Sequence, residues 1–173
     1  MTTNKCHICG LIYDNDSHST HSNTHMTPIL PNLYLGSKTN AHSLNELKYF
    51  QIKTVFNVAY EIQKPLTNEL KYIRCYWDDH HDFDILVDLD EIVDQIHGDV
   101  SKNNAVLIHC AHGISRSPTV IIGYLIKYLN MSFNDARKHV KLLRHNVNPN
   151  KGFIEKLKMY DMIQNNDENN CMI

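Results

Sequence analysis

The sequence has no long hydrophobic run and almost no excess of charge of either sign. Its longest apolar stretch, Val120 to Ile126, contains Gly123 and is far too short to span a bilayer. Lysine and arginine number 17 against 19 aspartates and glutamates, so the net charge of -2 indicates no overall attraction to nucleic acid or membrane. We therefore expect no membrane partner and no nucleic-acid partner. The 173 residues, 42% of them hydrophobic, suit one globular domain with a real core.

Cysteine is also scarce, and its distribution is irregular. Cysteines stand at positions 6, 9, 75, 110 and 171, an odd number without regular spacing. This pattern argues against a disulfide framework, and no secretory signal is recognisable. We expect a reducing compartment, with cytoplasmic localisation and the nucleus also open.

The most informative stretch runs from Val106 to Thr119 and reads VLIHCAHGISRSPT. Its first three apolar residues predict a buried strand, Gly113 permits a backbone conformation that other residues resist, and Pro118 suits the first turn of a helix. A strand, a loop and a helix in this order aim free backbone N–H groups at one point. Such a loop binds an anion such as phosphate. The predicted phosphate-binding residues are Ala111, His112, Gly113, Ile114, Ser115 and Arg116.

Cys110, at the end of the predicted strand, is the expected nucleophile. A cysteine at a helix N-terminus beside an arginine loses its proton more easily than a free one, so a thiolate is expected. Arg116 returns to the rim of the loop, where its planar guanidinium can hold two phosphate oxygens as lysine cannot. Ser117 can donate a hydrogen bond to the sulfur as it leaves, and His109 is expected to fix the loop rather than titrate.

Here the chain resembles a known family. His109-Cys110, five residues, and then Arg116-Ser117 resemble the active-site signature of the cysteine-based protein phosphatases, and Gly-Ile-Ser-Arg-Ser-Pro-Thr resembles the dual-specificity branch. Two further strings are similar to that family, NLYLGS at 32–37 and PNKGF at 149–153. The resemblance implies a central mixed sheet of about five strands flanked by helices, phosphoprotein substrates, and a phosphocysteine intermediate formed without metal or cofactor. With no docking domain recognisable, the small, atypical type is expected.

The loop from Trp77 to Asp84 reads WDDHHDFD and should supply the proton that the leaving oxygen needs. A carboxylic acid in reach of that oxygen can protonate it, and the resulting carboxylate can then activate water. The resemblance selects Asp79 for this role, with Asp78 as the second choice. Asp82 and Asp84 are expected to cap or charge the following helix start.

The remaining chain alternates predicted strands and helices, which favours a layered α/β domain with helices on both faces of the sheet. The predicted strands are 28–37, 54–58, 72–77 and the apolar run before Cys110. The predicted helices start at Ser43, cover 85–100 and 117–129, start again at Ser132, and follow the PNKGF string. Ser43 with Glu46 and Ser132 with Asp135 form capping boxes. The predicted catalytic domain spans 28–164, and 165–173 form a polar tail.

The first 27 residues are polar and rich in histidine, and a weakly ordered extension is expected. Within them, Cys9 and His21 are separated by eleven residues and His21 and His25 by three. This is one residue short of the common spacing of two-cysteine, two-histidine zinc fingers. Cys6, Cys9, His21 and His25 are therefore zinc candidates, and a merely polar tail is the competing interpretation.

Three alternative functions stay open. His112 resembles the loop of RNA 5′-triphosphatases, although those relatives usually carry Asn-Arg-Thr at 115–117, and the acidic stretch 75–101 disfavours RNA. A phosphoinositide phosphatase would usually place lysines inside the loop. A non-catalytic phosphoprotein-binding module would typically lose the nucleophile.

Two further features each have two interpretations. Cys75 is either a resolving thiol or a small buried hydrophobe. The basic segment 127–158 either steers acidic substrates or forms solvated helix surfaces.

Overall fold

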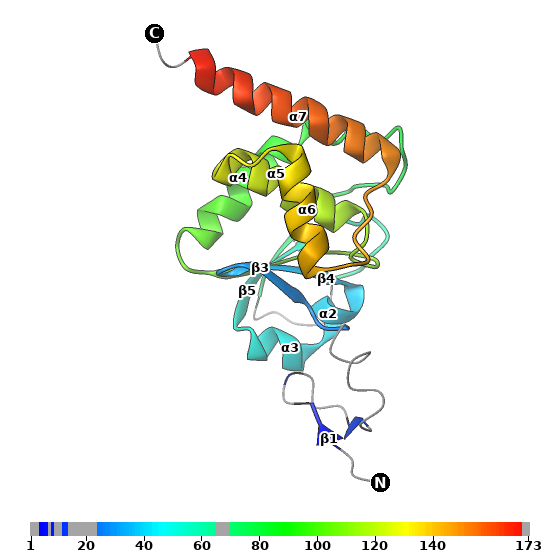
Figure 1. Cartoon of the computed structure of the whole chain (residues 1–173). Helices are drawn as coiled ribbons and strands as arrows, with labels where there is room; N and C mark the ends of the chain where they lie inside the picture. The colour runs from blue at the N-terminus through cyan, green and yellow to red at the C-terminus, as the bar shows by residue number, and fades with distance from the viewer. Residues whose placement is uncertain (1–3, 7, 9–11, 14–23, 65–69, 171–173) are drawn as a thin grey trace.

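The computed structural model describes residues 4–6, 8, 12–13, 24–64 and 70–170. A five-stranded sheet lies between two layers of helices, with the N-terminus and the C-terminus at opposite ends of the molecule (Figure 1). A separate antiparallel pair, β1 (Asn4–Lys5) with β2 (Ile12–Tyr13), lies near the N-terminus. This arrangement confirms the predicted α/β class with a central sheet flanked by helices.

The main sheet is mixed, as expected. Its strand order is β3 (Thr27–Leu30), β4 (Leu33–Ser37), β7 (Ala105–Cys110), β5 (Ile52–Asn57) and β6 (Lys71–Arg74). The β3–β4 pair is antiparallel, whereas β4, β7, β5 and β6 pair in parallel. The central strand β7 is buried at every position. A strand covered on both faces needs a continuous apolar run, which explains the sequence before Cys110.

The helices divide between the two faces of the sheet. One face carries two short helices, α2 (Lys38–His42) and α3 (Leu44–Tyr49). The other carries the 3-10 turn η2 (Ile85–Val87), α4 (Leu89–Val100), α5 (Arg116–Leu129), α6 (Phe133–Leu143) and α7 (Lys151–Asn170), as Figure 1 shows. Across the part of the chain that the structure describes, no helix has the length and apolar character to cross a membrane.

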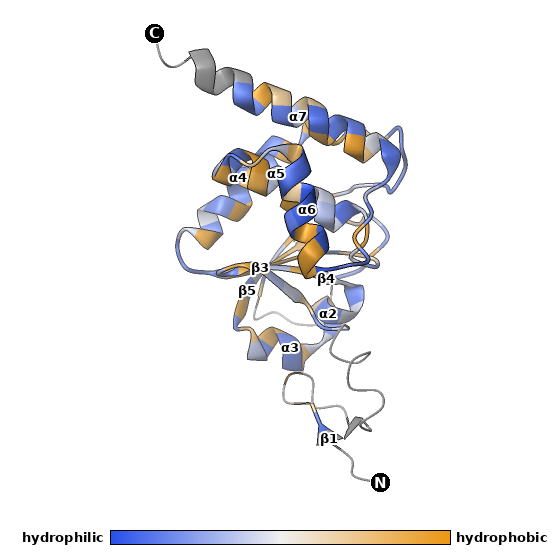
Figure 2. Cartoon of the chain, in the orientation of Figure 1, coloured by the Kyte–Doolittle hydropathy of each residue, from blue (hydrophilic) through white to orange (hydrophobic). Residues whose placement is uncertain are grey.

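The core is built around α5, which is buried from Arg116 to Ile126. On its side of the sheet, α5 packs with α4, α7 and the apolar side chains of Val106 and Ile108. Leu107 points to the opposite face, where it packs with Ala41 and the other residues of a smaller cluster. Figure 2 shows α6 and α7 mixing hydrophilic and hydrophobic residues, as expected for helices with one buried face.

Several predicted boundaries were wrong. The segment 28–37 is not one strand but the hairpin of β3 and β4, because Asn32 takes a left-handed conformation with φ 64° that turns the chain. Helix α2 was not predicted. The helix expected over 85–100 begins as the 3-10 turn η2, and α4 follows from Leu89. The last helix extends through Asn170, where a polar tail was expected.

The two predicted helix starts are confirmed as serine N-caps, but the reciprocal half of a capping box is not formed at Ser43, whose backbone N–H donates to the Asn40 carbonyl. The Ser43 hydroxyl accepts a hydrogen bond from the Glu46 backbone, and Ser132 does the same for Asp135. Packing also reaches further toward the N-terminus than the predicted domain start at residue 28, because His25 and Met26 are both buried.

The position of α5 generates a stability prediction. Ile121 is fully buried, so Ile121→Ala should remove apolar contacts, leave a cavity and lower the free energy of unfolding by about 2–5 kcal/mol. Val87 is 82% exposed, so the control Val87→Ala should change that free energy by less than about 0.5 kcal/mol. Urea unfolding followed by circular dichroism measures both, and equal effects would contradict the central place of α5.

Candidate active site

The site forms where two parallel strands end side by side. Ser37 of β4 is in register with Cys110 of β7, and the loop 110–116 leads from β7 into α5. Strand β4 and the residue that follows it support this loop: Lys38 donates its backbone N–H to the Ala111 carbonyl, and the Gly36 carbonyl oxygen lies 3.3 Å from the Ser117 hydroxyl. The carboxyl ends of the strands therefore hold the predicted phosphate loop in place.

Gly113 is required by the geometry of this loop. Its φ is +70°, and a Cβ added there would lie 2.7 Å from the Gly36 carbonyl oxygen. Only glycine takes this conformation without strain and without that clash. The loop consequently folds tightly enough for the Gly113 N–H to point at the Cys110 sulfur, at 3.2 Å.

The Cys110 sulfur accepts two hydrogen bonds and is buried. The Gly113 N–H is one donor, and the Ser117 hydroxyl, 3.3 Å from the sulfur, is the second. Both groups come from the segment that follows Cys110, so the loop and the first turn of α5 enclose the sulfur.

His109 is fully buried beside Cys110. Its Nδ1 lies 3.3 Å from the Cys110 carbonyl oxygen and its Nε2 lies 3.4 Å from the Tyr72 hydroxyl. These partners suit a neutral ring that donates from Nδ1 and accepts at Nε2. Burial lowers the pKa of His109 to about 4. His109 is therefore a neutral side chain in contact with the Cys110 backbone carbonyl.

Arg116 is buried against an acidic partner that the sequence did not reveal. Its two terminal nitrogens donate to the Glu61 carboxylate at 2.6 and 2.5 Å, and one of them also donates to the Trp77 carbonyl. Burial alone would lower the pKa of Arg116, but its hydrogen bonds to Glu61 and its electrostatic interactions with Cys110, Glu61 and Asp79 raise it. The hydrogen bonds from Arg116 in turn lower the pKa of Glu61. The guanidinium thus remains charged and fixed in its plane.

The third nitrogen of the Arg116 guanidinium, Nε, differs from the two that contact Glu61. This nitrogen is buried, and among the residues that the structure describes it has no hydrogen-bond partner. The nearest acidic oxygen, Oδ2 of Asp79, lies 3.9 Å away. A buried donor without a partner is costly, so this nitrogen is suited to an anion that enters the loop.

Asp79 is held over the phosphate loop by two donors. The Ser115 hydroxyl lies 2.6 Å from Asp79 Oδ1, and the Asn150 side-chain amide lies 2.9 Å from the same oxygen. The Asn150 backbone N–H donates in turn to the Ser115 hydroxyl at 3.2 Å. The structure therefore brings Asp79 together with the loop, whereas the exposed Asp78 makes no such contact in the described part of the chain.

The loop that carries Asp79 is packed against the start of α7. A Cβ added to Gly152 would fall well inside contact distance of the His81 carbonyl oxygen and carbon. Asn150 caps the same helix by accepting the Phe153 N–H with its side-chain oxygen, at 3.0 Å. One short segment therefore begins α7 and positions the acid loop.

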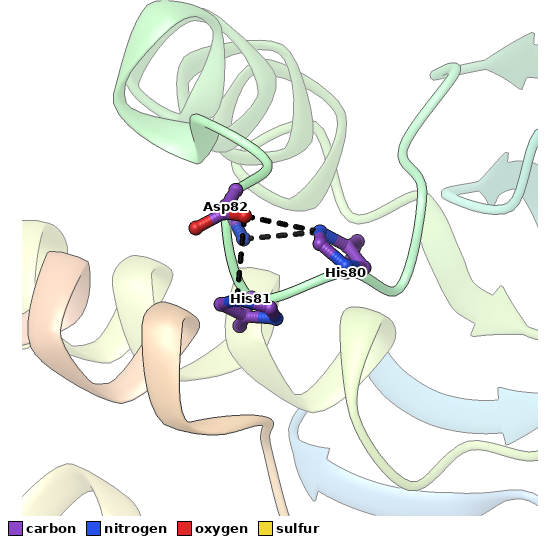
Figure 3. A group of neighbouring side chains, drawn as sticks. All are labelled: His80, His81 and Asp82. Carbon is purple, nitrogen blue, oxygen red and sulfur yellow. Dashed lines mark hydrogen bonds and ion pairs between the residues drawn. The ribbon is translucent and has the colours of Figure 1, made fainter.

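The other predicted residues of this region differ in their exposure. His112 and Ile114 are exposed, while Ser115 is buried. Asp84 caps η2 by accepting the Leu86 N–H, as expected for a helix start. Asp82 instead contacts its two histidine neighbours, His80 and His81 (Figure 3).

These three neighbours have metal-binding atoms close together. His80, His81 and Asp82 offer nitrogen and carboxylate atoms within 4.8 Å of one another. All three side chains are exposed on the loop, and their drawn contacts are to one another (Figure 3). Built sites usually support their ligands with further hydrogen-bonded groups, so we assign no metal site to this cluster.

The N-terminal zinc candidates are only partly described. The Cys6 sulfur and the His25 Nε2 lie 3.3 Å apart, whereas Cys9 and His21 lie outside the described residues. The remaining cysteine of interest, Cys75, is buried, and burial raises its pKa to about 12. At neutral pH, Cys75 is therefore a protonated thiol, which favours the interpretation of a small buried hydrophobe.

Three residues of the site were missed by sequence reasoning. They are Glu61, Asn150 and Arg144, whose Nε donates to the Gly113 carbonyl at 3.3 Å. Glu61 lies shortly after the end of β5, at the same sheet edge as Cys110, so topology could have suggested it. Asn150 lies inside the PNKGF string. Nothing in the sequence distinguishes Arg144, the C-cap residue of α6, from the basic residues within that helix.

The comparisons with known proteins agree with this geometry. Residues 33–163 match the family model described as the catalytic domain of dual specificity phosphatases. Dual specificity protein phosphatase 6 of Homo sapiens is 38% identical over 131 residues, covering 75% of this chain and 34% of that protein. Dual specificity protein phosphatase 18 of Pongo abelii is 33% identical, covering 79% of this chain and 72% of that protein.

The fold comparison gives the same result. A crystal structure of human DUSP28, in variant form, superposes with a TM-score of 0.79 at 26% identity and covers 82% of this chain and 97% of that one. The first curated relatives are longer proteins, of which the matched segment spans only 27% and 34%.

The burial of His109 generates a prediction of pH dependence. Its folded pKa lies below the usual value of about 6.5, so the unfolded chain binds the proton at higher pH than the folded one. The stability from the neutral side chain is present above about pH 6.5 and is lost as the pH falls toward about 4. Urea unfolding at several pH values should show this slope in the wild type and a shallower one in His109→Gln. Identical slopes would contradict the prediction.

The contact between Gly152 and the acid loop generates a second prediction. Gly152→Ala should force His81 or α7 to move and lower the free energy of unfolding by about 1–3 kcal/mol. Gly98 lies inside α4 with no atom near an added Cβ, so the control Gly98→Ala should raise that free energy by about 0.5–1 kcal/mol. Thermal unfolding of both variants measures the difference, and effects of the same sign would refute this account.

Proposed function

Because the chain belongs to the dual specificity phosphatase family, we propose that it hydrolyses phosphotyrosine and phosphoserine or phosphothreonine in proteins through a phosphocysteine intermediate. The observation that carries this proposal is the meeting of three groups. The Cys110 sulfur lies inside the loop with two donors on it, Arg116 has a buried free Nε, and Asp79 is held over the same loop.

In the first step, the Cys110 thiolate attacks phosphorus as the bond to the leaving oxygen breaks. The loop N–H groups and the Arg116 guanidinium hold the phosphate oxygens, whose charge spreads in the transition state. Asp79, protonated at this stage, gives its proton to the leaving oxygen of the side chain. The products are a dephosphorylated protein and a phosphocysteine.

In the second step, water attacks phosphorus and the sulfur leaves. The Asp79 carboxylate takes a proton from the water, which returns the residue to its starting state. The Ser117 hydroxyl, 3.3 Å from the sulfur, donates to it as the negative charge returns. Inorganic phosphate is released, and no metal ion is required at any point.

Glu61 and Asn150 are proposed as positioning residues. Glu61 accepts a hydrogen bond from each terminal nitrogen of Arg116, which fixes the guanidinium plane and leaves Nε for an oxygen of the bound phosphate. Asn150 and Ser115 share one oxygen of Asp79, which sets the direction in which its other oxygen faces. Phosphoprotein substrates and a cytoplasmic or nuclear location follow as parts of the same proposal.

The experiment that tests this function compares two substrates. Phosphate release from a peptide phosphorylated on Thr and Tyr, and from 5′-triphosphorylated RNA, would be measured with wild type and Cys110→Ser. We expect turnover of the peptide by the wild type alone. Turnover of RNA but not of the peptide would instead assign the specificity to the exposed His112, and turnover of neither would indicate a binding module.

The assignment of the acid is tested separately. Asp79→Asn should lower kcat for the peptide by about 10²–10⁴-fold, because the leaving oxygen loses its proton donor. Its neighbour Asp78 is exposed and does not contact the loop, so Asp78→Asn is the matched control and should keep a rate near that of the wild type. A large loss in Asp78→Asn together with an active Asp79→Asn would reverse the assignment.

A further inference from the structure

Cys6, His25 and Glu46 form a chain of contacting polar side chains on the face of the domain away from α5. The Cys6 sulfur lies 3.3 Å from His25 Nε2, and His25 Nδ1 lies 2.9 Å from Glu46 Oε1. All three side chains are buried, with exposed fractions of 7%, 6% and 4%. Polar groups are rarely buried together without a specific purpose, and the proposed phosphatase reaction uses none of these three.

We propose that Cys6 and His25 are ligands of one structural zinc ion. In a tetrahedral site with Zn–S of about 2.3 Å and Zn–N of about 2.0–2.1 Å, the sulfur and the nitrogen lie about 3.5 Å apart. The observed separation of 3.3 Å is close to that value. The two atoms therefore already stand at the distance that a shared ion requires.

The position of Glu46 supports a metal ligand in particular. A histidine that binds zinc almost always donates its other ring N–H to a carboxylate or carbonyl, which fixes the ring. His25 Nδ1 meets the Glu46 carboxylate in this way, which leaves Nε2 facing Cys6. Glu46 is itself fixed, because its other oxygen accepts the Met26 N–H and the Asn40 side-chain amide, both at 3.1 Å.

The sequence contains further residues of the types that bind zinc. Cys6 directly follows β1, which pairs with β2, and Cys9 is three residues further along the sequence. His21 precedes His25 by four residues. Two cysteines and two histidines close a structural zinc site with no open position. Cys9 and His21, the other two zinc candidates of the sequence, lie outside the described residues, so the proposal concerns Cys6 and His25.

A buried site of this kind does not suit a reactive thiol. A nucleophilic cysteine needs access to its substrate, and the Cys6 side chain is almost fully covered. A closed metal site needs no such access, and it would stabilise a segment that otherwise has few apolar residues with which to form a core.

The proposed zinc site is connected to the phosphate loop through Arg144. This side chain donates to the His25 carbonyl and the Thr27 hydroxyl with one nitrogen, and to the Gly113 carbonyl with another. Loss of the metal should therefore loosen the support of Gly113. This consequence for catalysis depends on the proposed phosphatase function, whereas the metal site itself does not.

The test is metal content, measured independently of activity. Protein purified without chelators or a histidine tag would be analysed by plasma mass spectrometry for wild type, Cys6→Ser and His25→Asn. Cys75→Ala and His42→Asn remove the same residue types elsewhere and serve as matched controls. We expect about one zinc per chain in the wild type and both controls, and a loss of at least half in the two ligand variants.

Two further measurements remain informative if a ligand variant fails to fold. Cobalt(II) added to the metal-free wild type should give the thiolate charge-transfer band of a tetrahedral site. Glu46→Gln should still bind zinc but about 10–100-fold more weakly in a competition with a chromophoric chelator. A wild-type protein that contains no zinc, and binds none when zinc is added under reducing conditions, would overturn the metal site. Phosphatase activity in that same preparation would leave the proposed function standing.

Discussion

The burial of one positive charge organises this molecule. The Arg116 guanidinium is only 5% exposed, and a buried charge is stable only when partners and hydrogen bonds compensate it. Its partners come from two separate loops: Glu61 after β5, and Trp77 and Asp79 after β6. The phosphate loop that carries Arg116 is the third. Three connections at one edge of the sheet are thus held together by a single side chain.

The same edge explains which parts of the site could be predicted from the sequence. Cys110, Gly113 and Arg116 share one short stretch, in which spacing alone fixes the geometry of strand, loop and helix. Glu61 and Asn150 reach the site only through the folded topology, so local patterns do not indicate them. The proposed acid could be predicted from local patterns only in part. A run of aspartates identified its loop, and only the resemblance selected Asp79 within it.

The prediction of the fold was likewise correct where local sequence patterns are strong and wrong where they are not. The buried strand β7 and helix α5 have strong apolar patterns, and both appear where expected. The hairpin of β3 and β4 was read as one strand, because the apolar alternation continues through a turn that depends on Asn32 alone. His25 and Met26 look like part of a polar extension, yet the Glu46 carboxylate brings both into the packed domain.

The packing of Gly152 under the acid loop has a kinetic consequence. Ser115 and Asn150 already hold Asp79 over the phosphate loop, and α7 leaves the His81 backbone little room to swing away. Under the proposed mechanism, the loop that carries Asp79 does not need to close over each substrate, so no binding energy is spent on a lid motion. Turnover should then be limited by chemistry or phosphate release rather than by loop closure.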